Sequence, residues 1–493
     1  MTTNNFTDCV LAIDIGSSSI KAGLFSSQCD LVEGSLVAVP HYQKFTSDGG
    51  VEENASLLRS SIESVIDGIV AMVEHRNLNI ITVAIDSMAS TIVGLDKNND
   101  PVTPFFSYAD TRNSDDVDDL KSLIDVDLVH QRTGVIQHTS YLPARIMWYK
   151  RTQPQLYSEI SKWVDISTYI YLQWFHPEKV KSSFCISSWS GMIDRFKRSW
   201  DQELLEILDI DLFNLPELSS WDEPISGLNK NFSDRWKTLK EVPFLLSVGD
   251  GLTANLGSGC VDSSKLAVTI GSTGAMRTIV SGNPEVPMGL WAYCFGRDMN
   301  ILGGSFTEGG NVLVWARQSL GIDTSEGIDN LLGGKKPDSH KLTVLPFLSG
   351  ERSVGWNGSA TATIKGLKMT TSGTDILQAL CESIAYRFAD VMDRITPYLS
   401  TDLEVIASGG ALVESKWWVQ TIANVLNKPI TVCDVEQQTL YGTAKLGLKS
   451  LGLINNFDDI PIKRRYVSEP DVTLIEMMAL ARERQGDLYT KLM

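Results

Sequence analysis

The sequence lacks the patterns that mark secreted, membrane-spanning and zinc-binding proteins. No apolar run approaches the roughly 20 residues needed to cross a bilayer, and the polar start, Met1 to Asp8, has no basic-then-apolar secretory signal. The seven cysteines are isolated, and neither a CxxC pair nor an HExxH motif occurs. We therefore expect a cytoplasmic protein with reduced thiols, no structural zinc and no membrane partner.

Positive charge is also scarce, with 43 Lys and Arg against 60 Asp and Glu and a net charge of −17. Because such a chain repels phosphate backbones and has no basic run, a nucleic-acid partner is not expected. The 493 residues, 43% of them hydrophobic, are enough for two to four globular domains.

Two common phosphate-binding motifs are missing or weak. The chain has no G-x-x-x-x-G-K-[ST] and is therefore not a P-loop enzyme. The string Gly249–Ala254 fits a loose G-x-G-x-x-A, but the carboxylate of Asp250 would lie where a pyrophosphate should bind. A dinucleotide-dependent oxidoreductase, which would bind NAD, is thus the weakest of the alternatives.

One strand–turn–strand pattern occurs twice. Val10–Phe25 contains an apolar strand, a Gly/Ser turn and a second strand, and Leu266–Val280 repeats it. Ala12–Ser18 aligns without a gap with Ala267–Thr273, at an offset of 255 residues. A single repeat at half the chain length predicts a duplicated domain.

The two turns differ in a way that suits a magnesium nucleotide. Turn N–H groups and hydroxyls can donate to anionic oxygens, and glycines let a ligand approach the backbone. The first copy carries an acid, Asp14, which could hold Mg²⁺. The residues predicted to bind the nucleotide phosphates are Gly16, Ser17, Ser18 and Lys21 in the first copy and Gly271, Ser272, Thr273 and Gly274 in the second.

Asp250 is the candidate catalytic base. Val242–Val248 resembles a strand and Leu252–Gly257 the opening of a helix, so Asp250 would lie near a helix N-terminus, where the dipole favours ionisation. A carboxylate on a Gly-flanked turn can accept the proton of a substrate hydroxyl. Further on, Gly409, Gly410 and Ala411 lie between a predicted strand, Leu403–Ile406, and a predicted helix, Lys416–Asn427, where a base or ribose could lie against the backbone.

These motifs, in this order, resemble those of the FGGY carbohydrate kinases, within the superfamily that includes hexokinase and actin. The resemblance runs from about Val10 to about Leu451. It implies that Asp14–Ser19 and Gly271–Gly274 are the two phosphate loops, that Gly249–Gly251 carries the catalytic base and that Gly409–Ala411 contacts adenosine. The third position of that last segment is often Gly in the family, whereas here it is Ala411.

The subfamily is suggested by other segments. Four segments look most like gluconate kinases: Tyr108–Arg112, Ala267–Arg277, Gly309–Arg317 and Leu345–Arg352. Ala89, however, stands where xylulose kinases and many gluconate kinases have His. An open-chain sugar acid, above all gluconate, is the expected acceptor, with xylulose or another pentulose or polyol as the alternative. The candidates for the sugar pocket are Met88, Ala89, Asp110 and Asp250. Arg112 is one candidate cation for a substrate carboxylate, and a surface or inter-strand salt bridge is the alternative for it.

The expected fold is α/β, with two ribonuclease-H-like lobes at residues 8–250 and 251–493 and a nucleotide cleft between them. ATP and Mg²⁺ are the expected cofactors, and the resemblance allows a homodimer. An actin-like assembly protein or a regulatory pseudokinase is the alternative of a different class. Three further segments have ordinary expectations: core packing for Trp189 and other tryptophans, a solvated helix start for Asp115–Asp119, and a terminal helix for Arg464–Met493.

Overall fold

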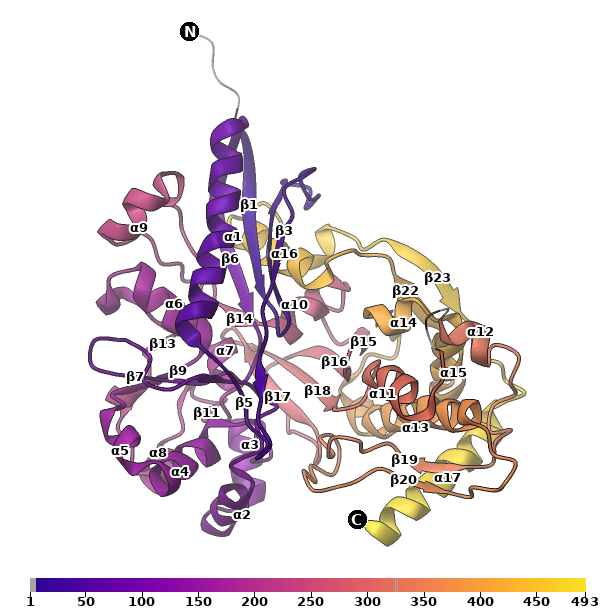
Figure 1. Ribbon diagram of the computed structural model, residues 1–493. Coiled ribbons are helices and arrows are strands. Elements are labelled where there is room, and N and C mark those ends of the chain that lie inside the picture. Colours follow the sequence, from indigo (N-terminus) through magenta and orange to yellow (C-terminus); the bar gives the residue numbers. More distant parts are fainter. Residues whose placement is uncertain (1–5, 324, 326) are drawn as a thin grey trace.

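The computed structural model describes residues 6–323, 325 and 327–493. It contains two large mixed β-sheets, one built from each half of the chain, with helices packed against both (Figure 1). The predicted α/β fold with two ribonuclease-H-like units is confirmed by the strand order of these sheets, which the next paragraphs give.

The first sheet has the strand order β14-β6-β1-β2-β3. Strands β1 and β2 form an antiparallel hairpin, β3 continues it in antiparallel fashion, and β6 and β14 lie parallel on the other side of β1. The bounds are β1 (Thr7–Ile15), β2 (Ser19–Phe25), β3 (Val37–Pro40), β6 (Leu78–Ser87) and β14 (Val248–Gly249).

The second sheet repeats this order and these directions with β18-β16-β15-β21-β22, and adds one strand at each edge, β17 and β23. The duplicated hairpin of the sequence is thus part of a duplicated sheet. The bounds are β15 (Lys265–Ile270), β16 (Gly274–Ser281), β17 (Trp291–Phe295), β18 (Met299–Phe306), β21 (Glu404–Ser408), β22 (Ile430–Cys433) and β23 (Arg464–Ser468).

Both faces of the first sheet are covered, and one cover comes from the far end of the chain. Side chains alternate along β1, so Leu11 and Ile13 pack with helix α1 (Ala55–His75), whereas Val10 and Ala12 pack with helix α16 (Gln438–Ser450). Helix α1 begins at Asn54, whose side chain accepts a hydrogen bond from the amide of Leu57.

Helix α16 also crosses helix α10 (Asp250–Gly257), which follows β14 directly. The two helices approach so closely that a Cβ at Gly257 would meet the carbonyl oxygen of Gln438, and one at Gly442 would meet that of Thr253. Glycine on each helix therefore allows the backbones to touch. This contact holds α10 against the helix that also covers β1 of the first sheet.

Two helices pack against the second sheet, α13 (Gly373–Ile395) and α15 (Lys416–Leu426), and α17 (Ile475–Leu492) packs on both of them. A capping box between Ser372 and Asp375 starts α13, the most extensively buried of them. The remaining elements are β4 (Lys44–Phe45), β5 (Val51–Glu53), β7 (Val93–Leu95), β8 (Phe105–Phe106), α2 (Ser114–Leu123), α3 (Val126–Thr133), α4 (Leu142–Thr152), α5 (Pro154–Glu159), β9 (Lys162–Val164), α6 (Ile166–Trp174), β10 (Ser182–Ser183), α7 (Phe184–Ser188), β11 (Ile193–Asp194), β12 (Ser199–Trp200), α8 (Gln202–Leu208), β13 (Leu218–Ser219), α9 (Lys230–Arg235), α11 (Asn311–Leu320), α12 (Ile328–Leu332), β19 (Thr343–Leu345), β20 (Thr363–Lys365) and α14 (Gly410–Val413).

Two of the expected elements were wrong in extent. The predicted strand over 242–248 is only β14, because Phe244 forms isolated bridges instead of a continuous ladder. The predicted terminal helix over 464–493 begins with β23, which pairs with β22, and becomes helical only at α17. Asp116, in the acidic run that starts α2, is buried and accepts hydrogen bonds from Arg151 instead of facing solvent.

In the described part of the chain, no helix is both long and apolar enough to cross a membrane. All seven cysteines are free and buried. Burial raises the pKa of several of these thiols, that of Cys185 to about 12, so they are poor nucleophiles and pack as small apolar groups.

Candidate active site

A cavity of about 240 Å³ lies where the two hairpins and the start of α10 converge. The turn of the first hairpin contributes Ser17, the second hairpin contributes Gly271, Thr273 and Gly274, and α10 contributes Asp250. The other lining residues are Ala89, Ser90, Tyr108, Trp189, Gly251, Ala254, Thr269, Ala275, Arg277, Ser305, Arg352 and Thr439. Residues from both halves of the chain thus meet around a single candidate base.

Both predicted hairpins form, and each has a tight turn at the expected residues. In the first, the amide of Gly16 donates to the carbonyl of Ser19 (3.1 Å), and in the second the amide of Gly271 donates to the carbonyl of Thr273 (3.0 Å). Ser18 and Ser272 are exposed at the tips of these turns. The turn hydroxyls are therefore free to donate to an anionic ligand.

Asp14 and Asp86 lie side by side on the parallel strands β1 and β6. Burial, with a contribution from nearby Asp250, raises the pKa of Asp14 to about 6, and Lys21, which faces Asp14 across the hairpin, opposes this rise. Asp86 is fully buried, and burial together with Asp14 raises its pKa well above the ordinary value. Sequence reasoning missed Asp86, although its place at the end of an apolar strand was a usable signal.

The carboxylates fit a magnesium ion that also binds phosphate. Thr443 of α16 donates its hydroxyl to one oxygen of Asp86, while the other oxygen has no partner among the described residues. In that same part of the chain no group of three or more His, Cys, Asp or Glu side chains could hold a metal. Mg²⁺ typically takes only one or two carboxylates together with water and substrate phosphates, which matches this donor set.

Asp250 is the first residue of α10, with Gly249 at the N-cap. Its Oδ1 accepts a hydrogen bond from the amide of Gly251 (2.8 Å). Burial raises its pKa, although the charge of Arg277, the Gly251 amide and, more weakly, Arg352 act in the opposite direction. The helix dipole was expected to favour the ionised form of Asp250, and desolvation, the largest effect on its pKa, acts against that form.

The segment Gly409–Ala411 lies against the second hairpin. The backbone of Gly409 is left-handed (φ 88°), and a Cβ there would collide with the backbone of Ile270. Ser408 shares a 3.0 Å hydrogen bond with Thr269, which lines the cavity. Gly409, Gly410 and Ala411 are thus brought beside the predicted phosphate loop, just outside the cavity itself.

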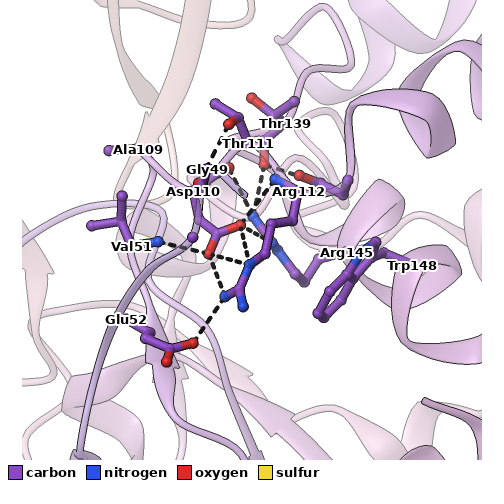
Figure 2. Close-up of polar contacts among 12 residues, drawn as sticks. Gly49, Val51, Glu52, Ala109, Asp110, Thr111, Arg112, Thr139, Arg145 and Trp148 are labelled. Carbon is purple, nitrogen blue, oxygen red and sulfur yellow. Dashed lines mark hydrogen bonds and ion pairs between the residues drawn. The ribbon is translucent and has the colours of Figure 1, made fainter. Parts of the chain in front are cut away.

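Only some of the candidate residues for the sugar pocket line the cavity. Ala89 lines the cavity, whereas Met88 is buried in the core behind it. Asp110 and Arg112 do not line this cavity. Instead, Figure 2 shows Asp110 between two arginines: Arg112 donates to its Oδ2 (2.6 Å) and Arg145 donates to its Oδ1.

This ion-pair cluster is self-contained. Arg112 also donates to Glu52 (3.1 Å), and the amide of Val51 donates to Asp110 (2.9 Å). Burial alone would raise the pKa of Asp110, but the hydrogen bonds from Arg112 and the charge of Arg145 outweigh it and hold that pKa below the ordinary value. The cation of Arg112 is already neutralised, and its proposed role with a substrate carboxylate stays an untested prediction.

Several residues of the cavity were not singled out from the sequence. Trp189, expected to be an ordinary core residue, lines the cavity and stacks on Tyr293 with ring centroids 3.7 Å apart. Arg277 and Arg352 also line it; in the sequence each is the last residue of a segment that resembles gluconate kinases, but neither was given a role. Their place at the cavity is known only from the fold, which brings strands β16 and β18 together with the segment after β19.

Comparison with known proteins agrees with this geometry. The N-terminal domain model of the FGGY family of carbohydrate kinases matches residues 9–257, and the C-terminal domain model matches residues 266–451. The gluconokinase of Bacillus subtilis (strain 168) is 26% identical over 466 residues, which is 92% of this chain and 90% of that protein. The xylulose kinase of Staphylococcus xylosus is 23% identical over 92% of each chain.

Solved structures show the same fold. The gluconate kinase of Lactobacillus acidophilus superposes with a TM-score of 0.90 at 22% identity, covering 99% of this chain and 98% of that one. The ligand-bound xylulose kinase of the same organism also gives 0.90 at 22% identity, covering 98% of each. These matches favour a kinase over the assembly-protein and oxidoreductase alternatives. The chain belongs to the FGGY family of carbohydrate kinases, and it is an ATP-dependent phosphotransferase that acts on a small sugar or a related compound.

Proposed function

We propose that the protein transfers the γ-phosphoryl group of ATP to a terminal hydroxyl of a small open-chain sugar acid, with gluconate as the preferred acceptor. One observation carries this proposal: the carboxylate of Asp250 lies in a cavity bordered by both phosphate-loop hairpins. The similarity to gluconokinases over more than nine-tenths of the chain supports the choice of acceptor.

Asp250 acts as the base. It takes the proton of the acceptor hydroxyl while that oxygen bonds to the γ-phosphorus and the bond from phosphorus to the ADP oxygen breaks. The amide of Gly251 and the charge of Arg277 stabilise the ionised form that this step requires, and the raised pKa makes Asp250 a stronger base than an exposed carboxylate. Ser17 and Thr273 donate hydrogen bonds to the phosphate oxygens.

Asp14, with Asp86 as its neighbour on β6, would hold Mg²⁺. A cation bound there would supply positive charge to neutralise the transferred phosphoryl group. The proximity of the two carboxylates supports this assignment, because their mutual repulsion is relieved when a cation is present. Lys21 faces Asp14 and adds positive charge at the first phosphate loop.

The adenosine moiety lies along Gly409, Gly410 and Ala411. A Cβ at Gly410 would meet nothing within 4 Å, so there is room for a planar base at that point. We further propose that the two lobes comprise residues 8–250 and 251–493. The protein is proposed to be cytoplasmic and able to form a homodimer. Helix α16 packs with α10 and also with Val10 and Ala12 of β1, and it therefore connects the two lobes next to the base.

A pentulose such as xylulose is the second candidate acceptor. The xylulose kinase of Lactobacillus acidophilus matches the fold as well as the gluconate kinase does. Ala89 lines the cavity at the position where the FGGY resemblance leads us to expect His. Its smaller side chain leaves more room for the acceptor.

The test is the release of ADP from Mg-ATP with gluconate, xylulose, ribulose, glycerol and glucitol, together with mass analysis of the product. We expect strong stimulation by gluconate and formation of a phosphogluconate. Stimulation by xylulose alone would show that xylulose and not gluconate is the acceptor, and would still support kinase activity. No stimulation by any acceptor, with ATP bound, would contradict the proposed function.

A further inference from the structure

Two arginines line the cavity without a carboxylate partner. Among the described residues, no ion pair within 4 Å involves Arg277 or Arg352, in contrast to Arg112 and Arg145, which share Asp110 (Figure 2). The side chain of Arg352 makes no hydrogen bond within the part of the chain that the structure describes, and its Nε is buried and unpartnered. A buried guanidinium N–H without an acceptor costs folding free energy, unless a bound ligand supplies the missing acceptor and counter-charge.

The charges of the two arginines act on Asp250 to different extents. A Cβ at Gly251, next to Asp250, would lie 2.8 Å from Nη1 of Arg277. Arg277 is hydrogen-bonded to Thr269 of the second hairpin (3.2 Å) and affects the pKa of Asp250 more strongly than Arg352 does. Arg277 therefore belongs to the reacting end of the cavity.

Arg352 lies among aromatic rings. Its guanidinium carbon is 5.3 Å from the ring centroid of Tyr108 and 5.9 Å from that of Trp356. Trp356 in turn contacts His138 edge-on at 5.3 Å. Burial and the charge of Arg352 lower the pKa of His138 to about 3, so this imidazole is neutral at physiological pH and adds no competing charge.

In an open-chain sugar acid that is phosphorylated at its terminal hydroxyl, the carboxylate is at the opposite end from the reacting oxygen. The negative charge of Asp250 also disfavours a second carboxylate beside it. We propose that Arg352 binds the carboxylate of the substrate and thereby selects sugar acids over neutral polyols. This inference rests on the proposed function and names the residue that determines its substrate class.

The surroundings of Arg352 suit this role. A guanidinium offers two parallel N–H donors that match the oxygens of a carboxylate, and its flat face can stay stacked on Tyr108 while its edge binds the ligand. Because aromatic rings exclude water and compete for none of these donors, the ion pair forms in a medium of low polarity.

The experiment compares gluconate with glucitol, which carries a hydroxymethyl group in place of the carboxylate. Values of kcat and KM are measured for both acceptors with the wild type and with Arg352→Gln, Arg352→Lys and Arg277→Gln. Arg76→Gln, at the exposed end of α1, is the matched control. Thermal unfolding of each variant verifies that it is folded.

We expect Arg352→Gln to lower kcat/KM for gluconate by about 10- to 100-fold, mainly through KM, and to lower the preference for gluconate over glucitol by a similar factor. Arg352→Lys keeps the charge and should recover part of that preference. Arg277→Gln should lower kcat with both acceptors and keep the preference.

Two results would overturn the inference alone: equal losses with both acceptors in a folded Arg352→Gln variant, or a preference that disappears in Arg277→Gln instead. A wild type that prefers glucitol would overturn both the inference and the proposed acceptor, while leaving the kinase. A wild type that phosphorylates neither these acceptors nor any sugar would remove the proposed function, and the inference with it.

Discussion

The imidazole of His41 connects the first phosphate loop to the strand β5. Its Nε2 lies 2.7 Å from the carbonyl oxygen of Gly16, and its Nδ1 lies 2.8 Å from Oε2 of Glu53. Because both partners are acceptors, both ring nitrogens must donate, which requires the protonated form. Burial would lower the pKa of His41, but the hydrogen bonds with Glu53 and Gly16 outweigh this effect and raise it.

We predict that His41→Asn increases the KM for ATP about 3- to 10-fold, the equivalent of one hydrogen bond, because the turn at Gly16 loses its support. The KM for the acceptor should not change. Steady-state kinetics with each substrate varied in turn measures both values. An equal increase in both KM values would show that His41 supports the fold in general and not the phosphate loop.

The ion-pair cluster around Asp110 gives a prediction about stability. Asp110→Asn leaves Arg145 buried without its counter-ion, and we expect the free energy of unfolding to fall by about 3–5 kcal/mol. Arg112→Gln should cost less, because Arg112 is only partly buried and Arg145 still neutralises Asp110. Urea denaturation measures both. If Arg112→Gln instead raises the KM for gluconate with little loss of stability, then Arg112 does belong to the sugar pocket.

Because α10 and α16 are in close contact, we predict that adding a single methyl group between them lowers both stability and kcat. Gly442→Ala would place a Cβ against the carbonyl of Thr253, so we expect a loss of about 1–3 kcal/mol and a lower kcat, since α10 carries Asp250. The matched control is Gly486→Ala in α17, where a Cβ meets nothing within 4 Å. That change should stabilise the protein by up to about 1 kcal/mol. Similar effects of the two substitutions would contradict the close helix contact.

Burial of neutral His138 predicts how stability depends on pH. The unfolded chain takes up a proton at this side chain below about pH 6.5, whereas the folded protein, with a pKa of about 3, does not. The unfolded state therefore binds more protons, and the free energy of unfolding decreases by up to about 1.4 kcal/mol per pH unit as the pH falls through this window. Chemical denaturation between pH 7 and 4 measures the slope, and His138→Asn should reduce it. An unchanged slope in the variant would assign the effect to other groups.

The sequence was sufficient to predict the parts of the fold and site that depend on local patterns. The two hairpins, the carboxylate at the start of α10 and the turn at Gly409 each lie within about fifteen consecutive residues, and their spacing is visible without a structure. The strand β23 was missed because its neighbour, β22, is some thirty residues earlier and the pairing is not encoded locally.

The pairs that determine the chemistry of the site are not local. Asp86 becomes important only because β6 lies beside β1, and its partner Thr443 comes from a helix near the end of the chain. Whether an arginine is free or paired is likewise a property of the packed structure. The sequence offered Arg112 as a candidate for a substrate carboxylate, but it is neutralised by Asp110, whereas Arg352 makes no ion pair with the described residues and lies over the rings of Tyr108 and Trp356.

The most direct test of the central claim is sugar-dependent phosphoryl transfer by Asp250→Asn compared with the wild type. ADP release is followed with gluconate and Mg-ATP at saturation, and the binding of both ligands to the variant is measured by calorimetry. Asn keeps the size of the side chain but cannot accept the hydroxyl proton, so we predict intact binding of both ligands and a kcat reduced by about 100-fold or more. A variant that binds both ligands and still turns over at the wild-type rate would show that Asp250 is not the base.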